Sequence, residues 1–190
     1  MATAEHVPER IELAVLFSDI KGFSRFADVT EPEYTLDLLR SYYELATRTA
    51  ATHGGFVFDT AGDTVGILFN GPRRLSAFEA ASLRAAVQLR DDFRTIASYW
   101  SKRGPQVGLA IGVAAGFATV GVIGAGDHIG YRAIGRTVNV AGRLCGAALD
   151  GQILTNQQVA DRAIGIALQP HDDVSSLRGI QRPTKVFRVA

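Results

Sequence analysis

The stretch FSDIKGFS, residues 17–24, sets the beginning of the fold. It overlaps the end of an apolar run, IELAVLFS at residues 11–18, which predicts a buried strand. The strand leads into Asp19, and Gly22 then breaks the chain before a helix. Backbone N–H groups in such a turn can bind phosphate, and a carboxylate beside them can hold a hard cation. A strand-end aspartate can equally cap the helix, so this stretch alone predicts a strand, a turn and a helix but no chemistry.

Downstream of this unit, the pattern alternates between long helices and short strands. A helix that starts near Pro32 is expected to turn Leu36, Leu39 and Tyr43 towards the core. The order predicts an α+β fold in which helices cover a mixed sheet. The further elements are expected at residues 56–58 and 64–69 (a β-hairpin), 73–100 (a helix), 129–134 (a strand), 137–148 (a helix) and 185–190 (a strand).

Composition indicates one globular domain. The chain has 190 residues, of which 47% are hydrophobic and 21% charged, and we expect a tail at residues 1–10 and a single domain at 11–190. A formal net charge of +1 argues against a nucleic-acid-binding surface. The one cysteine, Cys145, excludes an intrachain disulfide and is expected to be a buried thiol. Residues 1–10 lack an apolar segment typical of a secretion signal, so a cytoplasmic location is expected.

The uncharged segment 107–126 allows two interpretations. It is long enough to cross a bilayer, and Gly108, Gly112 and Gly116 form a GxxxG series of the kind that packs membrane helices. However, its bulky residues alternate with small ones, as a strand requires. We therefore expect no membrane span, but two buried strands joined by a tight turn.

A second segment with chemical potential is GGFVFDTAGD, residues 54–63. Asp63 stands at the expected hairpin tip, where it would meet Asp19 if the two strands are neighbours. Two converging carboxylates repel each other unless a cation lies between them, and divalent ions in that place serve phosphoryl transfer. On its own, Gly62-Asp63 is also ordinary turn chemistry.

The third segment is YRAIGRTVNVAGRL, residues 131–144. Asn139 and Arg143 are four residues apart, so they share one face of a helix. An amide beside a guanidinium can orient a ribose and neutralise charge that builds on a phosphorus centre. An isolated pair of this kind is more often simply an exposed polar helix face.

Taken together, the three segments resemble the class III adenylate and guanylate cyclases. The motifs F-x-D-I-x-G-F-[ST], G-G…G-D and Y-x-x-I-G-x-x-V-N-x-A-x-R-L follow in the family's order from about residue 12 to 154, with a weaker match at 178–189. The resemblance implies a ferredoxin-like βαββαβ core sheet with covering helices. It also implies an enzyme that joins the 3′-hydroxyl of a nucleoside triphosphate to the α-phosphate and releases pyrophosphate.

The resemblance assigns roles to individual residues. Asp19 and Asp63, helped by the carbonyl of Ile20, are expected to bind two Mg²⁺ or Mn²⁺ ions. Asn139 is expected to orient the ribose, and Arg143 to stabilise the transition state. Substrate contacts are expected from the turn residues Lys21, Gly22, Phe23 and Ser24, and from Arg178, or alternatively Arg182, on the distal phosphates.

Members of this family act as head-to-tail dimers, in which one chain supplies the metal aspartates and the other supplies the base-selecting and transition-state residues. This chain carries both sets. A homodimer with two shared sites is therefore expected, and a monomer should be nearly inactive.

Base selection departs from the family pattern at two positions. Adenylate cyclases carry lysine four residues before the second metal aspartate, where this chain has Asp59, and aspartate or threonine seven residues before the asparagine, where it has Arg132. The hydrogen-bonding polarity of the two base-selecting positions is therefore the reverse of that in adenylate cyclases. Asp59 could accept from uracil N3–H while Arg132 donates to O4 or O2; guanine and cytosine also offer matching groups. Alternatively, the two side chains form an ion pair across the dimer and touch no base.

A second resemblance favours a pyrimidine substrate. The chain is almost entirely catalytic domain, and short cyclases with altered base-selecting residues are similar to the pyrimidine cyclases of bacterial antiphage signalling, whose cUMP or cCMP acts on a separate effector protein. We expect UTP, then CTP, with a guanylate or adenylate cyclase as the alternative. An inactive nucleotide-binding homologue is the third reading. The presence of all four residues Asp19, Asp63, Asn139 and Arg143 argues against it.

Overall fold

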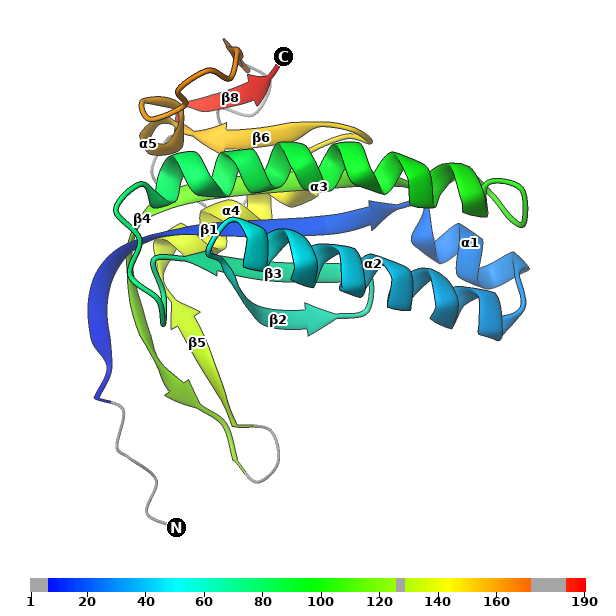
Figure 1. The fold of residues 1–190 in the computed structure, drawn as a ribbon, viewed down its shortest axis with the longest axis horizontal. Coiled ribbons are helices and arrows are strands. Elements are labelled where there is room, and N and C mark those ends of the chain that lie inside the picture. The colour runs from blue at the N-terminus through cyan, green and yellow to red at the C-terminus, as the bar shows by residue number, and fades with distance from the viewer. Residues whose placement is uncertain (1–6, 126–128, 172–183) are drawn as a thin grey trace.

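Helices cover both faces of one sheet in the computed structural model, which describes residues 7–125, 129–171 and 184–190 (Figure 1). The described elements are β1 (Glu9–Lys21), α1 (Phe23–Val29), α2 (Pro32–Thr52), β2 (Phe56–Ala61), β3 (Thr64–Phe69), α3 (Phe78–Trp100), β4 (Gly108–Ile123), β5 (Gly130–Ile134), α4 (Arg136–Ala147), β6 (Ile153–Asn156), α5 (Gln157–Ala160), β7 (Leu168–Pro170) and β8 (Val186–Val189).

The sheet has the predicted ferredoxin-like centre. Within the described residues its strand order is β2-β3-β1-β4-β6-β8-β7, with β5 paired to β4 off this path. β1 runs antiparallel to both β3 and β4, and it pairs with β4 from Glu9 opposite Val120 to Lys21 opposite Gly108. The order β2-β3-β1-β4, with crossover helices between β1 and β2 and between β3 and β4, confirms the expected α+β fold.

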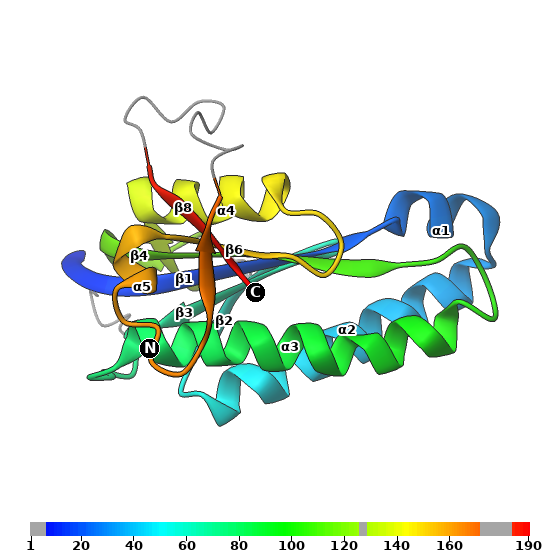
Figure 2. The same ribbon diagram turned by 90° about the horizontal axis from the view of Figure 1, so that it is seen from above.

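Alternation along β1 divides the core into two layers. Leu16 and Ile20 pack with the core residues of α2 and α3, whereas Leu13 and Val15 pack with those of α4. All four are nearly or fully buried, as a strand covered on both faces requires. Figure 2 shows α4 on one side of the sheet and α2 and α3 on the other.

The expectation of two strands in segment 107–126 is wrong, because β4 is a single strand from Gly108 to Ile123. Its glycines admit close neighbours and do not form a turn. A Cβ on Gly112 would lie 2.2 Å from the Cys145 backbone nitrogen, and one on Gly108 would lie 1.7 Å from Asp150 Oδ1. No helix in the described part of the chain is long and apolar enough to cross a membrane.

Helix α3 begins at Phe78, five residues later than the sequence indicated. Asn70 has a positive φ of 68°, and its side-chain oxygen accepts from the Leu75 N–H at 2.8 Å. This contact holds the segment before the helix as a loop, since asparagine tolerates the left-handed conformation and bonds nearby backbone.

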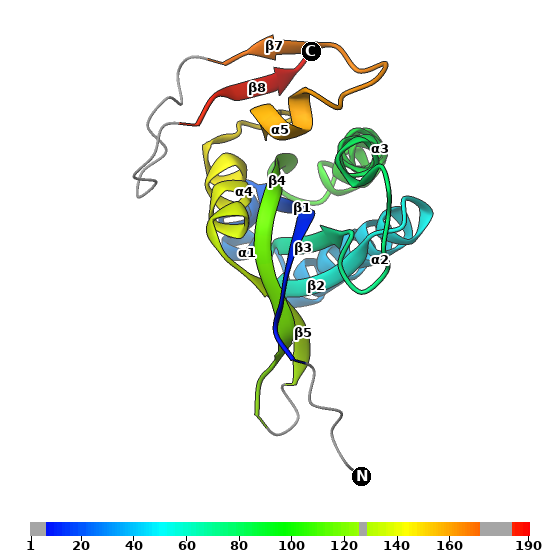
Figure 3. The same ribbon diagram turned by 90° about the vertical axis from the view of Figure 1, so that its left-hand side faces the viewer.

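The second half of β4 and strand β5 form a ribbon that projects from the body of the molecule (Figure 3). Val122, Ile123, Ile129 and Ile134 on this ribbon are 42–59% exposed. A protruding ribbon with exposed branched aliphatic side chains is typical of a surface that contacts another protein.

Candidate active site

Asp19 lies near the end of β1, where its carboxylate is held by two neighbours. Thr64, its register partner on β3, donates from Oγ1 to Asp19 Oδ1 at 3.0 Å. Lys21 donates from Nζ to Oδ2 at 2.9 Å, and the side chains of Lys21 and Asp19 are 30% and 27% exposed. The carboxylate is thus oriented and partly accessible at the edge of the core.

Asp63 stands in the two-residue turn between β2 and β3, directly beside this position. Its carbonyl accepts from the Ile20 N–H at 3.3 Å, so the hairpin tip is tied to the end of β1. Burial, and then the charge of Asp19, raise the pKa of the Asp63 carboxyl, while Lys21 opposes this rise. The structure therefore brings the two predicted metal ligands together as a pair of like charges.

The donor set fits a divalent cation. Two neighbouring carboxylates gain from a cation between them, and oxygen ligands are those that Mg²⁺ and Mn²⁺ prefer. Among the described residues, no three His, Cys, Asp or Glu side chains are grouped so that they could hold a metal ion together. Mg²⁺ commonly completes its coordination with backbone carbonyls, water or phosphate oxygens.

The turn after Asp19 follows the predicted course. Gly22 has a φ of 82° and precedes α1, and a Cβ there would lie 2.7 Å from the Gln106 carbonyl oxygen. Only glycine suits both the conformation and this close approach. Phe23 packs against the core, whereas Ser24 is exposed at the start of α1. Lys21 is engaged with Asp19 here, so in this arrangement its ammonium screens the carboxylate pair.

Sequence reasoning missed three residues that support the pair. Thr64 holds Asp19, Tyr43 donates its hydroxyl to the Gly62 carbonyl beneath the hairpin tip, and Tyr42 donates to the Ser18 carbonyl at 3.0 Å. Burial and the charge of Asp63 raise the pKa of Tyr43, so its hydroxyl stays a donor. Thr64 could have been found by pairing the two predicted strands, whereas the tyrosines required the position of α2.

Asn139 and Arg143 lie on the exposed face of α4, as predicted. The opposite face is buried through Val140, Ala141 and Leu144. No hydrogen bond or ion pair in the part of the chain that the structure describes joins Asn139 or Arg143 to either aspartate. The two pairs stand on different elements: Asp19 and Asp63 at the end of β1 and in the hairpin turn, Asn139 and Arg143 on α4. Arg178 and Arg182 lie outside the described residues.

Asp59 lies on β2 and Arg132 on β5, two strands that approach each other without pairing. Arg132 on β5 donates from Nη1 to the carbonyl of Phe58 on β2, the residue before Asp59 in the chain. Among the described residues neither side chain forms an ion pair, and both are half-buried. Phe58 and Tyr42 belong to the core, whereas Phe56 is 40% exposed and contacts Tyr131 edge to face.

Comparisons with known proteins agree with this geometry. The model of the adenylate and guanylate cyclase catalytic domain matches residues 6–187. The chain is 30% identical over 178 residues to an uncharacterized protein of Mycobacterium tuberculosis, covering 91% of this chain and 32% of that one. It is also 30% identical over 142 residues to adenylate cyclase 1 of Rhizobium meliloti, covering 74% of this chain and 21% of that one.

The chain thus spans about a third or less of these curated relatives. Among solved structures, the adenylyl cyclase CyaB of P. aeruginosa superposes with a TM-score of 0.90 at 28% identity, covering 97% of this chain and 96% of that one. With its fold, its paired aspartates and its family match, the chain belongs to the adenylate and guanylate cyclase catalytic domain family.

Proposed function

We propose that the chain is a nucleotide cyclase that converts a pyrimidine nucleoside triphosphate, UTP ahead of CTP, into the 3′,5′-cyclic monophosphate. In this reaction the 3′-oxygen loses its proton and bonds to the α-phosphorus, while the bond to pyrophosphate breaks. The observation that carries the choice of base is the hydrogen bond from Arg132 to the carbonyl of Phe58, the residue before Asp59, together with the exchange of acid and base at positions 59 and 132 relative to adenylate cyclases.

The exchange of acid and base at positions 59 and 132 decides which nucleobase finds matching hydrogen-bond partners. Asp59 can only accept, so it suits the N3–H of uracil, and the free nitrogens of Arg132 suit the flanking carbonyl oxygens. Adenine in the family's orientation would leave its ring nitrogen facing a carboxylate, and such a mismatch costs several kcal/mol when the groups are buried. The N1–H and O6 of guanine match this polarity too, so GTP is the alternative outside the pyrimidines.

The remaining residues take roles that match their positions. Asp19 and Asp63 would hold two Mg²⁺ or Mn²⁺ ions, which supply charge neutralisation and a more acidic 3′-hydroxyl when bound. Thr64 fixes the Asp19 carboxylate, and the turn at Gly22 presents backbone N–H groups to phosphate oxygens. Asn139 orients the ribose, and Arg143 donates to the oxygens of the transferring phosphate.

A homodimer supplies both sets of groups to one site. The exposed ribbon residues Val122, Ile123, Ile129 and Ile134 support an interface there, because burial of branched aliphatic side chains favours association. Each of the two sites would combine Asp19 and Asp63 of one chain with Asn139 and Arg143 of the other.

The base assignment is tested by incubating the purified protein with UTP, CTP, GTP and ATP separately, in the presence of Mn²⁺, and separating the products by mass. Predominant cUMP is expected. The exchange Asp59→Lys with Arg132→Asp should move the ratio of kcat/KM values towards ATP by about tenfold or more. Arg84→Ala, an exposed arginine on α3, is the control. Predominant cAMP from the unaltered protein would refute the assignment, and predominant cGMP would retain the polarity but exclude a pyrimidine.

We further propose that the cyclic pyrimidine nucleotide is a second messenger of antiphage defence that acts on a separate effector protein. This proposal rests on the resemblance to pyrimidine cyclases at the base-selecting positions and on the base assignment. In host cells, cUMP should rise after infection, and Asp19→Ala should remove both the rise and the protection against plaque formation. An unchanged cUMP level throughout infection would contradict it.

A further inference from the structure

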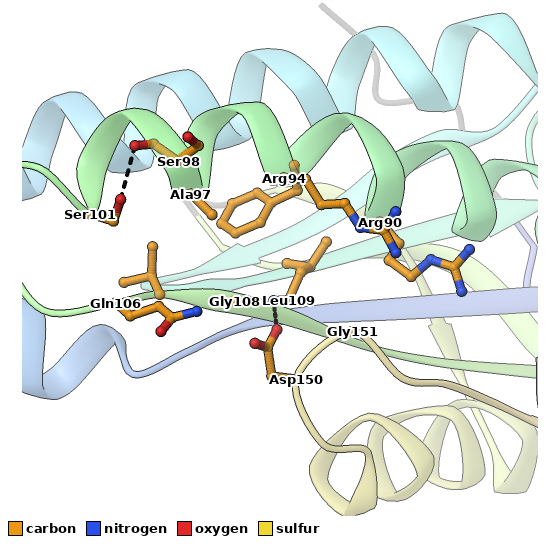
Figure 4. A pocket seen from close by; sticks show the side chains of 12 residues that line it. Arg90, Arg94, Ala97, Ser98, Ser101, Gln106, Gly108, Leu109, Asp150 and Gly151 are labelled. Carbon is orange, nitrogen blue, oxygen red and sulfur yellow. Dashed lines mark hydrogen bonds between the residues drawn. The ribbon is translucent and has the colours of Figure 1, made fainter.

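A cavity of about 490 Å³ opens on the side of the sheet that α3 covers (Figure 4). It lies between the second half of α3, the start of β4 and the loop before β6, and none of the residues assigned to catalysis lines it. Its volume lies within the range of small-molecule sites, roughly 300–1,000 Å³.

One wall of the cavity is cationic. Arg90 and Arg94 are four residues apart on α3, and Figure 4 shows both side chains reaching towards the same end of the cavity. The Arg90 side chain is only 14% exposed; its Nε donates to Asp91 Oδ1 at 2.9 Å, and its two terminal nitrogens have no hydrogen-bond partner among the described residues. Arg94 Nη1 lies 3.5 Å from the same Asp91 oxygen. A single carboxylate therefore faces two guanidinium groups, and the wall carries unneutralised positive charge.

The opposite wall accepts hydrogen bonds. Asp150 holds its carboxylate against the start of β4, where Oδ1 accepts from the Leu109 N–H at 3.0 Å. The absence of a side chain at Gly108 makes room for it, since a Cβ there would lie 1.7 Å from that oxygen. Asp150 lines the cavity at the edge of β4, and its second carboxylate oxygen accepts no hydrogen bond within the described residues, so it is available to a ligand hydroxyl. Ser98 and Gln106 add further polar groups to the lining.

We propose that this cavity binds a phosphorylated, hydroxyl-bearing small molecule, of the class of sugar phosphates and nucleoside monophosphates. Its phosphate would lie at Arg90 and Arg94, because the planar guanidinium group binds phosphate oxygens through two parallel hydrogen bonds. Its hydroxyl groups would donate to Asp150.

The floor of the cavity is formed by β4, which pairs with β1, the strand that carries Asp19. Gly108 and Leu109 on β4 pair directly with Lys21 and Ile20 on β1, and the next pair along is Ala110 with Asp19. A ligand on the cavity side of this ladder therefore lies one strand away from the carboxylate pair. Its binding should change the cyclase rate, by about fivefold if the coupling has the usual strength of an allosteric site.

Thermal unfolding with ribose 5-phosphate and with UMP, each compared with its unphosphorylated counterpart, ribose or uridine, tests the proposal. The phosphorylated probes should raise the melting temperature in a concentration-dependent way, and the unphosphorylated ones should not. The double variant Arg90→Gln, Arg94→Gln should weaken the apparent affinity by about tenfold or more, because charge-assisted hydrogen bonds are lost. Arg84→Gln, on the same helix but outside the cavity, should bind as the unaltered protein does.

Ser98→Glu is a second variant, in case the double variant does not fold, and it should reduce the shift by placing a carboxylate one helical turn from Arg94. Equal melting shifts in the unaltered protein and in both kinds of variant would locate the probe in the cyclase site and overturn the proposal. Absence of any shift with either phosphorylated probe would overturn it as well. Neither result bears on the base preference, because that preference is read from the cyclised products.

Discussion

At the scale of single residues, the site is built from charges that are only partly compensated. Asp19 has Lys21 and Thr64 as partners, whereas Asp63 has burial and a like charge beside it. At Asp63, burial and the charge of Asp19 thus outweigh the backbone hydrogen bond and the Lys21 charge that favour the ionised carboxyl. A carboxyl group whose ionised form is disfavoured in this way is typical of sites that receive a charged ligand.

Asp63→Asn should stabilise the metal-free protein and remove its response to metal. The raised pKa means that the folded protein loses stability as the pH rises from the ordinary carboxyl value of 3.8 through the raised folded value. At pH 7 the variant avoids this cost, so its melting temperature in EDTA should be about 2 °C higher. Mn²⁺ should raise the melting temperature of the unaltered protein but not that of the variant. Asp28→Asn, at an exposed position, is the control; a lower melting temperature of Asp63→Asn in EDTA would contradict the prediction.

Cys145 should make the protein sensitive to alkali. Burial raises the pKa of this thiol from 9.0 to about 12, so the unfolded chain ionises first and the folded state loses stability between those values. The free energy of unfolding should fall with a slope that contains about 1.4 kcal/mol per pH unit from this group. Urea unfolding at pH 8, 9.5 and 10.5 measures the slope. Cys145→Ala should make it shallower, and an identical slope in the variant would exclude the thiol as the cause.

At the scale of elements, the position of helix α4 depends on strand β4, which has a glycine at the point where the helix crosses it. Gly112 of β4 faces the backbone of α4 at Ala141 and Cys145. This contact holds the helix close to the sheet and fixes the direction in which Asn139 and Arg143 point. The glycine series in β4 thus positions the helix that carries the expected catalytic groups.

Gly112→Ala should therefore destabilise the protein by about 1–3 kcal/mol, because overpacking pushes the helix away from the strand. It should also reduce cyclase activity, through displacement of Asn139 and Arg143. Gly146→Ala is the matched control on α4, since a Cβ there meets nothing within 4 Å. That control should gain up to about 1 kcal/mol from helix propensity. Urea titration followed by circular dichroism gives both values, and equal stability of the two variants would refute the packing argument.

Hydrophobic periodicity and turn residues in the sequence predicted those helices and strands that are specified by interactions within the segment itself. The first strand, the hairpin with Asp63 in its turn and the helix with Asn139 and Arg143 could all be predicted, because periodicity and turn residues specify them. The extent of β4 could not, since its glycines are explained only by Cys145 and Asp150 far along the chain.

The inward face of α2 was predicted wrongly in part. Leu36 is 61% exposed, whereas Leu38 and Tyr42 are buried, because the position of the sheet beneath the helix decides which stripe is covered. The same limit applies to the site. The pairing of Arg132 with the Phe58 carbonyl depends on the meeting of β2 and β5, and no local pattern reports that meeting.

At the scale of the whole molecule, the acidic pair and the amide–guanidinium pair belong to different regions of one chain. Asp19 and Asp63 lie at the end of β1 beside the hairpin, and Asn139 and Arg143 lie on the outer face of α4. With the apolar ribbon of β4 and β5, this division favours an assembly in which two copies exchange their groups.

Mixing Asp19→Ala with Arg143→Ala should restore activity that neither variant has alone. The heterodimer would contain one intact site, so its activity should be about half that of the unaltered dimer. Two different affinity tags isolate the heterodimer, and product formation is measured by mass. The control mixture, Asp19→Ala with Asp63→Ala, damages both sites and should stay inactive. No recovery in a confirmed Asp19→Ala and Arg143→Ala heterodimer would contradict shared sites.

The buried position of the one cysteine has a practical consequence for the study of that assembly. Since the native thiol is shielded, a cysteine introduced at the exposed Thr119 on the ribbon would be the preferred target of a maleimide dye or a nitroxide under gentle conditions. Resonance energy transfer or electron–electron resonance between two such probes would then report the approach of one subunit to another in solution, without prior removal of the native sulfur.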